Sequence, residues 1–283
     1  MNDLLSERLR RTNLVAGEGR EVAYDDLRKM KCPQSAKSHP SIPHVEVFDR
    51  FKHIFELRED IKIVRPRFLV SPKNAPVPYS RFMARFEIQK VEPNYGLTNH
   101  FGESPDYSFQ GAITNSYDQT LDTCCHFGTQ VFVCTNGMWW ISTKKNSSRM
   151  LSKHTMQEFS TMVWNLSCEL DSIYAEVVGG FEALKTHDFS SQREVHDFVL
   201  QSVQRGVIHR LEALMVLRHW IEPEHAEFRD RNGYSLFNAY TSHWRDSDQF
   251  VLPAKTMRLK SIMAEFKQAN RVDTVSMSSR SVL

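Results

Sequence analysis

The sequence predicts an α+β fold, in which a central, largely antiparallel sheet with an Asn-Gly hairpin packs against a C-terminal helical bundle. Apolar and polar residues alternate in the segments 82–92 and 107–114, which is the period of half-buried strands. Asn136-Gly137 between apolar runs is typical of a type I′ hairpin turn, because both turn residues need positive φ. From His154 onward, apolar residues recur at three- and four-residue steps, as in amphipathic helices. Strands followed by helices in this order favour an α+β architecture.

The composition is that of a soluble globular protein. The chain has 283 residues, of which 41% are hydrophobic and 25% are charged, and no apolar stretch is long enough to span a bilayer. The N-terminal segment MNDLLSERLRR lacks the apolar core of a secretory signal, and five cysteines are an odd number for a disulfide framework. We therefore expect a cytoplasmic protein with free thiols. The net charge of +2 is too small for a polybasic binder, so any contact with nucleic acid needs a local basic patch.

The chain is expected to divide into an arm, one domain and a tail. The stretch CPQSAKSHPSIPH has three prolines and three serines, which disfavour regular structure, so residues 1–44 are predicted to be an arm or linker. Residues 45–270 are predicted to form a single α+β domain, which is sheet-rich over 45–150 and helical over 151–270. The tail 271–283 is predicted to be disordered.

Within the sheet-rich part, the Asn-Gly turn defines two further strands. The apolar run 131–134 precedes the turn and the segment 138–142 follows it, so both are predicted to be strands of one hairpin. Because neighbouring strand residues face opposite ways, Trp139 and Trp140 cannot both point into the same core. Residues 93–106 contain glycines, prolines and asparagines, and they are predicted to form a long loop.

Helices are predicted from apolar spacing and from capping residues. A helix over 45–57 precedes the sheet, and a long helix from His154 is expected to end at Gly179-Gly180. Ser191 followed by Glu194 forms the pattern of a capping box, which predicts the start of a second helix of the bundle. Further helices are expected over 208–221, 234–245 and 254–269.

The sequence contains two weak metal-ligand patterns. Cys124, Cys125, His126 and Cys134 lie close together, but adjacent cysteines rarely reach one tetrahedral metal, so buried free thiols are the better interpretation. His219, Glu222 and His225 resemble a helical metal site, but Pro223 would end or kink that helix. No Walker, dinucleotide-binding or hydrolase-elbow motif is present. We therefore expect no metal, no cofactor and no catalytic residues.

Short polar residues follow the strand at 107–114. Asn115, Ser116 and Asp118 are residues that often hold ligands at a strand end, but they are also ordinary turn residues, and capping of the following segment explains them. Asp118 and Asp122 could hold Mg²⁺ in a nuclease, although a third acidic ligand is missing.

A nucleic-acid interface is predicted where aromatic strand residues adjoin a basic connector. Proteins that bind single strands stack bases on aromatic rings and follow the phosphates with cations. The alternative is that the rings belong to the core and that the connector KKNSSR is a solvated loop. The predicted interface consists of Arg85, Lys90, Tyr107, Phe109, Trp139, Trp140, Lys144, Lys145, Arg149 and Lys153.

Four segments in this order resemble a phage- and plasmid-like family, catalogued as domain of unknown function 932. These segments are NSYD at 115–118, VFVCTNGM at 131–138, KHT at 153–155 and LFNAYT at 236–241. The chain departs from the family pattern at Tyr117, Phe237 and Ser242. The resemblance implies a mobile-element origin, most simply a bacteriophage in a bacterial host, and no known reaction. The motif residues are Asn115, Ser116, Asp118, Asn136, Gly137, His154, Asn238 and Thr241.

Two hypotheses for function follow. The first is a non-catalytic, phage-encoded protein that binds single-stranded DNA during replication or recombination. The alternative is a phage inhibitor that binds a host anti-phage defence complex, through loops such as 93–106. Metal-dependent nuclease activity ranks third. We expect a homo-oligomer with no membrane partner, and we expect the Asn-Gly turn, Asn115–Asp118 and the start of the His154 helix to converge at one edge of the sheet.

Overall fold

The protein folds as two compact units. One unit comprises Met1–Val177 with Asp246–Pro253, and the other comprises Val178–Arg245 with Ala254–Leu283. The sequence predicts one domain that changes from sheet to helix near residue 150. The boundary between the two units lies instead after Val177, inside a helix, and residues 246–253 belong to the first unit. The computed structural model describes residues 19–33, 41–73, 75, 77–92, 96–98, 107–118, 120–131, 137–142, 156–189, 191–245 and 247–278.

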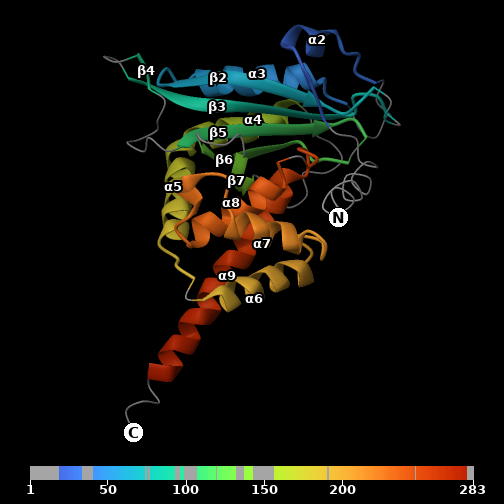
Figure 1. Ribbon diagram of the computed structural model, residues 1–283. Coiled ribbons are helices and arrows are strands. Elements are labelled where there is room, and N and C mark those ends of the chain that lie inside the picture. The colour runs from blue at the N-terminus through green and yellow to red at the C-terminus, as the bar shows by residue number, and fades with distance from the viewer. Residues whose placement is uncertain are drawn as a thin grey trace. The chain divides into compact units, whose positions relative to one another are not determined.

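The first unit contains a seven-stranded, antiparallel sheet with the order β1-β2-β3-β5-β6-β7, and β4 pairs with β3 outside this path (Figure 1). This sheet and the helices of the C-terminal part confirm the predicted α+β class. The strands predicted over 82–92 and 107–114 are also confirmed. The strands are β1 (Arg20–Val22), β2 (Ile61–Val70), β3 (Arg81–Glu92), β4 (Gly96–Thr98), β5 (Tyr107–Ser116), β6 (Cys124–Val131) and β7 (Gly137–Ser142).

The N-terminal part contains regular structure that composition did not reveal. The predicted arm 1–44 includes β1, which pairs with β2, and the short helix α2 (Tyr24–Lys29). Strand β6 begins at Cys124 and ends at Val131, so only Val131 of the strand predicted over 131–134 lies among the described residues. Residues 132–136, including Asn136 of the predicted turn, lie outside the described residues.

One face of the sheet is apolar and is covered by helix α3 (His44–Glu56), which confirms the helix predicted over 45–57 (Figure 1). The rings of Phe51 and Phe86 lie 5.0 Å apart, and the ring of Phe55 stacks on Phe127 at 6.3 Å. These rings are 0–1% exposed. The apolar spacing along α3 thus matches the every-second-residue spacing of the strands, and the core of this unit forms between them.

The helix that follows the sheet is longer than predicted. It consists of α4 (Met156–Cys168) and α5 (Leu170–Lys185), interrupted at Glu169, whose amide still donates to the Asn165 carbonyl at 3.0 Å. The expected end at Gly179-Gly180 is wrong. Phe181 directly after the glycines and Leu184 about one turn further are both buried, so the apolar stripe continues and keeps the segment helical.

The second unit is helical. The helix start predicted at Ser191 is confirmed, because the Ser191 hydroxyl caps the helix by accepting from the Glu194 amide at 3.2 Å. The helix predicted over 208–221 begins only at Ala213. The last helix extends to Ser278, into the tail that was predicted to be disordered. Its elements are α6 (Gln192–Gln204), α7 (Ala213–Ile221), a 3₁₀ turn η2 (Ala226–Phe228), α8 (Gly233–His243) and α9 (Leu252–Ser278). None of the helices among the described residues is both long and apolar enough to cross a bilayer.

Candidate functional site

The second face of the sheet carries polar and charged side chains that are also buried. Glu87 is 3% exposed and Gln110 is 6% exposed, although both point away from the phenylalanine face. A cavity of about 220 Å³ lies on this face. It is lined by side chains from four adjacent strands, namely Arg65, Arg67, Arg85, Glu87, Ser108, Gln110 and Gln130. We call this hollow the arginine cavity.

A β-bulge in β2 shapes one wall of the arginine cavity. Val64 pairs with Glu87 and Arg67 pairs with Arg85, so β2 has one residue more than β3 between these pairs. Arg65 in the bulge has φ of 51°, a left-handed conformation that is uncommon for a residue with a side chain. Pro66 is tolerated here because a bulge leaves one amide outside the ladder. As a result, Arg67 of β2 and Arg85 of β3 are direct partners on adjacent strands.

Carboxylates compensate two of the three arginines. The buried Glu87 carboxylate accepts from Arg65 at 3.0 Å and from the Gln89 amide at 2.7 Å. The Arg67 guanidinium donates to both oxygens of Glu21, at 2.9 and 2.7 Å. The hydrogen bond from Arg67 lowers the pKa of Glu21, so this carboxylate is ionised at neutral pH.

Arg85 has no such partner. Its guanidinium donates to the side-chain oxygen of Gln249 at 3.2 Å and lies over the Trp139 ring, 5.5 Å from the centroid. Among the described residues, no carboxylate lies within ion-pair distance of it. Burial, followed by the charge of Arg67, lowers the pKa of Arg85 to about 10. Arg85 is still charged at neutral pH, but its surroundings disfavour that charge.

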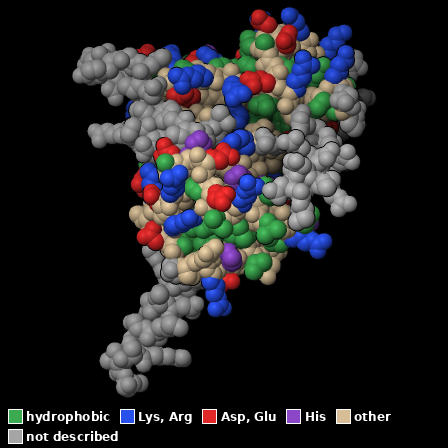
Figure 2. Space-filling model, viewed as in Figure 1, with side chains coloured by type: hydrophobic (Ala, Val, Ile, Leu, Met, Phe, Trp, Pro, Cys, Tyr) green, Lys and Arg blue, Asp and Glu red, His purple; other side chains and the backbone are tan. Residues whose placement is uncertain are grey.

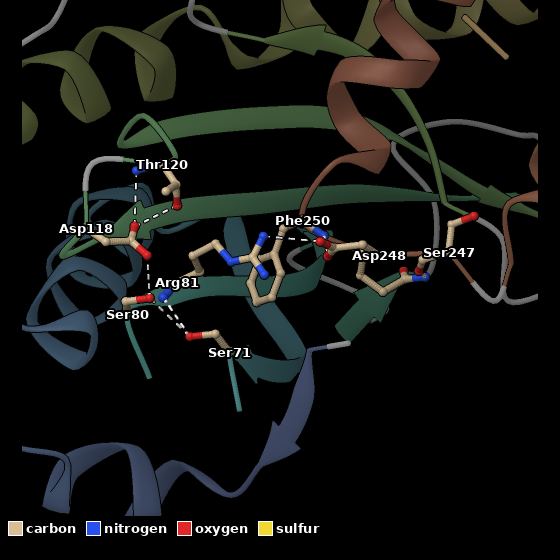
Figure 3. A network of polar contacts seen from close by, with 9 residues as sticks. Ser71, Ser80, Arg81, Asp118, Thr120, Ser247, Asp248 and Phe250 are labelled. Atoms are coloured by element: carbon tan, nitrogen blue, oxygen red, sulfur yellow. Dashed lines mark hydrogen bonds and ion pairs between the residues drawn. The ribbon is translucent and has the colours of Figure 1, made fainter. Parts of the chain in front are cut away.

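The segment 247–253 lies on the polar face and holds Gln249 beside Arg85. Arg81 forms an ion pair with Asp248 at 3.2 Å, and its guanidinium lies 4.9 Å from the centre of the Phe250 ring (Figure 3). Both members of the ion pair are largely buried, with side chains 16% and 11% exposed. The Arg81 amide also donates to the Ser71 hydroxyl at 3.1 Å. One end of the polar face is therefore closed by a compensated ion pair, while Arg85 next to it is left uncompensated.

The predicted polar motif at the end of β5 has a structural role. The Ser116 hydroxyl donates to the Leu121 carbonyl at 2.8 Å, and Asp118 accepts from both the amide and the hydroxyl of Thr120, at 3.1 and 2.6 Å (Figure 3). Asn115 donates from its side-chain nitrogen to the Ile42 carbonyl at 3.0 Å. The prediction that these residues act as turn and capping residues is confirmed, and Asn115 in addition ties the chain before α3 to the sheet.

Beside this motif, His44 is a buried, neutral histidine. Its ring stacks between Tyr117 and Phe82, with centroids 3.9 and 4.9 Å away. Its Nε2 lies 2.9 Å from the Tyr79 carbonyl, and its Nδ1 lies 3.0 Å from the Asn115 amide nitrogen. Burial lowers the pKa of His44 to about 4, against the opposing effects of the Tyr79 carbonyl and Asp118. The histidine therefore serves the packing at this end of the sheet.

The aromatic residues predicted to stack on bases are buried. Phe109 and Trp139 are each 1% exposed and Trp140 is 6% exposed. Phe109 packs on the apolar face, 6.1 Å from Phe127. A base could stack on none of these three rings without opening the core, which is the alternative that the sequence left open. The backbone of Tyr107 is placed in β5, but its side chain is not described.

A second bulge lies where the two tryptophans occur. Phe127 pairs with Ile141 and Gly128 pairs with Trp139, so Trp140 is the extra residue of β7. A Cβ added to Gly128 would lie 2.0 Å from the Met138 carbonyl oxygen, so only glycine permits this close approach of β6 and β7. The bulge interrupts strict alternation, and both tryptophans are buried.

The predicted basic residues are only partly placed. Arg85 lines the cavity, and Lys90 near the end of β3 forms an ion pair with Asp171 at 3.5 Å. Lys144, Lys145, Arg149, Lys153 and His154 lie outside the described residues. The structure therefore brings Arg85 and Trp139 together and says nothing of the connector.

The expected convergence of the motif segments at one edge is wrong for Gly137. Gly137 pairs with Gln130, and Ser108 pairs with the same Gln130 from the other side, so Gly137 lies level with the start of β5. Asn115 pairs with Phe82 at the opposite end of β5. In antiparallel neighbours, the end of one strand lies beside the start of the next. Asn115 near the end of β5 and Gly137 at the start of β7 are therefore separated by about the length of β6.

The remaining motif residues belong to the second unit. Asn238 and Thr241 in α8 are 0% and 4% exposed. Asn238 donates to the Tyr234 carbonyl at 2.9 Å, and the Thr241 hydroxyl donates to the Asn238 carbonyl at 3.2 Å. These contacts stabilise the interior of α8 and present no group to solvent.

Within the part of the chain that the structure describes, no three His, Cys, Asp or Glu side chains form a group that could hold a metal ion. Asp118 is engaged with Ser80 and Thr120, and Cys124 and Cys125 are buried in β6. Neither the nuclease pair nor the cysteine cluster forms a centre in the described residues. No family model matches the chain, and neither a curated protein nor a solved structure is similar to it.

Sequence reasoning missed Arg65, Arg67, Glu87 and Gln110 as parts of a site. One signal for two of them was present, because Pro66 interrupts an otherwise apolar strand and is flanked by arginines. A proline inside a strand indicates a bulge, and bulges often lie next to functional sites. The cross-strand pairing of Arg67 with Arg85 has no sequence signal of this kind.

Proposed function

We propose that the protein binds single-stranded DNA without catalysing a reaction, in the replication or recombination of a bacteriophage, and that the arginine cavity contacts its phosphates. The observation that carries the proposal is the Arg85 guanidinium opposite Arg67, for which the described residues supply no carboxylate within ion-pair distance. Like charges directly opposite each other on two strands destabilise a sheet. An anion in the arginine cavity would remove that cost.

A phosphate suits this cavity chemically. Arginine presents a planar fork of donors that matches phosphate oxygens, and such charge-assisted bonds are about twice as strong as neutral ones. Ser108, Gln110 and Gln130 add neutral polar groups at the same cavity. Side chains of Arg65 and Arg67 are 69% and 58% exposed, so the cationic rim is open to solvent.

Nucleic acid is the source of phosphate that the sequence favours. The predicted basic connector Lys144–Lys153 follows β7, and the family resemblance implies a mobile genetic element. Because the predicted stacking rings are buried, the proposed contact depends on phosphates rather than on base stacking.

The test is the affinity for a fluorescent oligothymidylate, measured by anisotropy over a series of salt concentrations. We expect the affinity to fall steeply with salt, because phosphate contacts release counterions. Arg85→Gln should weaken binding about tenfold, as expected for the loss of one charge-assisted contact. The matched control is Arg193→Gln, which removes an arginine whose side chain is 91% exposed on α6. Affinity that is independent of salt, or equal in the two variants, would refute the proposal.

A second candidate function is inhibition of a host defence complex, and one surface favours it. Four large apolar side chains of the second unit are strongly exposed, namely Leu200 (57%), Leu211 (46%), Leu214 (71%) and Ile221 (47%). Figure 2 shows hydrophobic side chains gathered on the visible face of this unit. Exposed apolar groups that gather on one surface often mark protein–protein contacts.

This candidate is tested by pull-down from bacterial lysate treated with nuclease. If it holds, a stoichiometric protein partner is retained by the wild type and lost with Leu211→Ser plus Leu214→Ser. The matched control is Leu57→Ser, which changes an exposed leucine (55%) of the first unit. Recovery of nucleic acid alone from untreated lysate would favour DNA binding instead.

A further inference from the structure

We infer that the arginine cavity receives the terminal phosphate of a DNA strand, so that the protein binds phosphorylated chain ends in preference to internal positions. This inference rests on the proposed DNA binding and names the part of the strand that the cavity accepts. It follows from the size, the charge and the geometry of the cavity.

The size of the arginine cavity suits a chain end better than a passing strand. Its volume is about 220 Å³, and its seven lining residues form one hollow across β2, β3, β5 and β6. Proteins that bind the middle of a single strand use extended grooves that follow the backbone over about 4–16 nucleotides. Pockets for whole drug-sized ligands occupy about 300–1,000 Å³. A hollow below that range accepts a phosphate group with little else attached.

The charge of the arginine cavity favours a phosphate over a neutral group. Three arginines and one glutamate line the cavity, and Glu21 pairs with Arg67 beside it, so one positive charge, that of Arg85, has no ion-pair partner among the described residues. Glu87 is held by Arg65 and Gln89, so its carboxylate does not neutralise Arg85. An internal phosphodiester carries one negative charge, whereas a terminal phosphate carries about −1.5 to −2 at neutral pH and has three free oxygens. The third free oxygen lets a terminal phosphate accept from Arg85 and from further donors of the cavity at the same time.

The register of the strands lets two arginines share one phosphate. Arg67 and Arg85 are direct cross-strand partners, and such partners have Cβ atoms about 4.5–5.5 Å apart. Glu21 accepts from the Nε and one terminal nitrogen of Arg67, so the other terminal nitrogen of Arg67 and the Arg85 guanidinium can donate to different oxygens of the same phosphate. Ser108 and Gln130, which are also direct cross-strand partners, add neutral polar side chains to the lining of the cavity.

The experiment compares one oligothymidylate in three forms, with a 5′-phosphate, with a 3′-phosphate and with hydroxyl groups at both ends. We expect a phosphorylated form to bind about tenfold more tightly than the hydroxyl form, because a second charge-assisted contact is added. In Arg85→Gln the preference should disappear, whereas Arg193→Gln should retain it. Thymidine monophosphate should compete with the phosphorylated strand, and thymidine should not.

The possible results separate this inference from the proposed function. Equal affinity for all three forms, with Arg85→Gln weakening each to the same degree, overturns the inference and leaves DNA binding in place. Absence of binding to every form overturns both. If Arg85→Gln does not fold, Arg67→Gln and competition by thymidine monophosphate against the wild type give the same decision. If thymidine monophosphate binds but no oligonucleotide does, the cavity is a mononucleotide site, and both statements about DNA are wrong.

Discussion

Two neighbouring residues on opposite faces of the sheet are almost equally buried but are stabilised in different ways. Phe86 is 1% exposed and its neighbour Glu87 is 3% exposed, yet they lie on opposite faces. Phe86 packs against the ring of Phe51, whereas Glu87 depends on Arg65 and Gln89. Burial alone therefore does not separate core from candidate site in this protein, and the completeness of charge compensation does.

The difference also concerns what each face contributes to stability. On the apolar face, ring contacts and burial act in the same direction and stabilise the fold. On the polar face, Arg85 opposes Arg67 and has no carboxylate within ion-pair distance among the described residues, so this position costs stability. Departures of this kind from favourable local chemistry are common at functional sites.

The largest expected effect comes from breaking the apolar face. Phe86→Ala should lower the free energy of unfolding by about 3–5 kcal/mol, because it leaves a cavity between α3 and the sheet. Chemical denaturation measures this change. Leu57→Ala is the control, since its side chain is 55% exposed and the loss should stay within about 0.5 kcal/mol. Equal losses in the two variants would mean that α3 does not pack on the sheet as described.

Acidification should weaken the end of the sheet near His44. The folded pKa of about 4 lies below the ordinary value of 6.5, so the neutral ring stabilises the fold above pH 6.5. This stability is lost as the pH falls from 6.5 toward 4, by up to about 3 kcal/mol. Denaturation curves of the wild type and of His44→Gln across this range isolate the contribution of His44. A parallel pH dependence in both proteins would show that His44 is not the titrating group.

Arg85→Gln sharpens the comparison because it should stabilise the free protein while it weakens binding. Removing the repulsion with Arg67 should gain about 1 kcal/mol or less, reduced by the lost contact with the Trp139 ring. Thermal melting at low salt detects this gain, and added salt should diminish it. A variant that is less stable than the wild type would assign Arg85 to the structure rather than to a ligand.

The smallest expected effect on stability concerns the predicted connector. Lys144→Ala with Lys145→Ala should leave the melting temperature nearly unchanged, because exposed charges contribute about 0.5 kcal/mol or less. The same variant should reduce oligonucleotide affinity and the slope of its salt dependence. Intact affinity would restrict the interface to the arginine cavity, and a large loss of stability would mean that these lysines are packed.

Local chemistry was readable from the sequence wherever it depends on neighbouring residues. The capping bond of Ser191 with Glu194, the alternation in β3 and β5, and the turn role of Asp118 all involve partners within a few positions. The α+β class follows from the same short periods. The error at Gly179-Gly180 arose because a glycine in a helix is tolerated when the next turn is buried, and Phe181 supplies that burial.

The candidate site was decided by long-range pairing. Arg85 appeared in the sequence as one cation on an alternating strand, and its significance depends on Arg67, on Gln249 and on the bulge that aligns β2 with β3. The sequence by itself determined which residues alternate, cap and turn, because those preferences act over a few residues. Only the tertiary structure decided which faces are covered and which charge remains uncompensated, because strand register and burial depend on residues far apart in the chain.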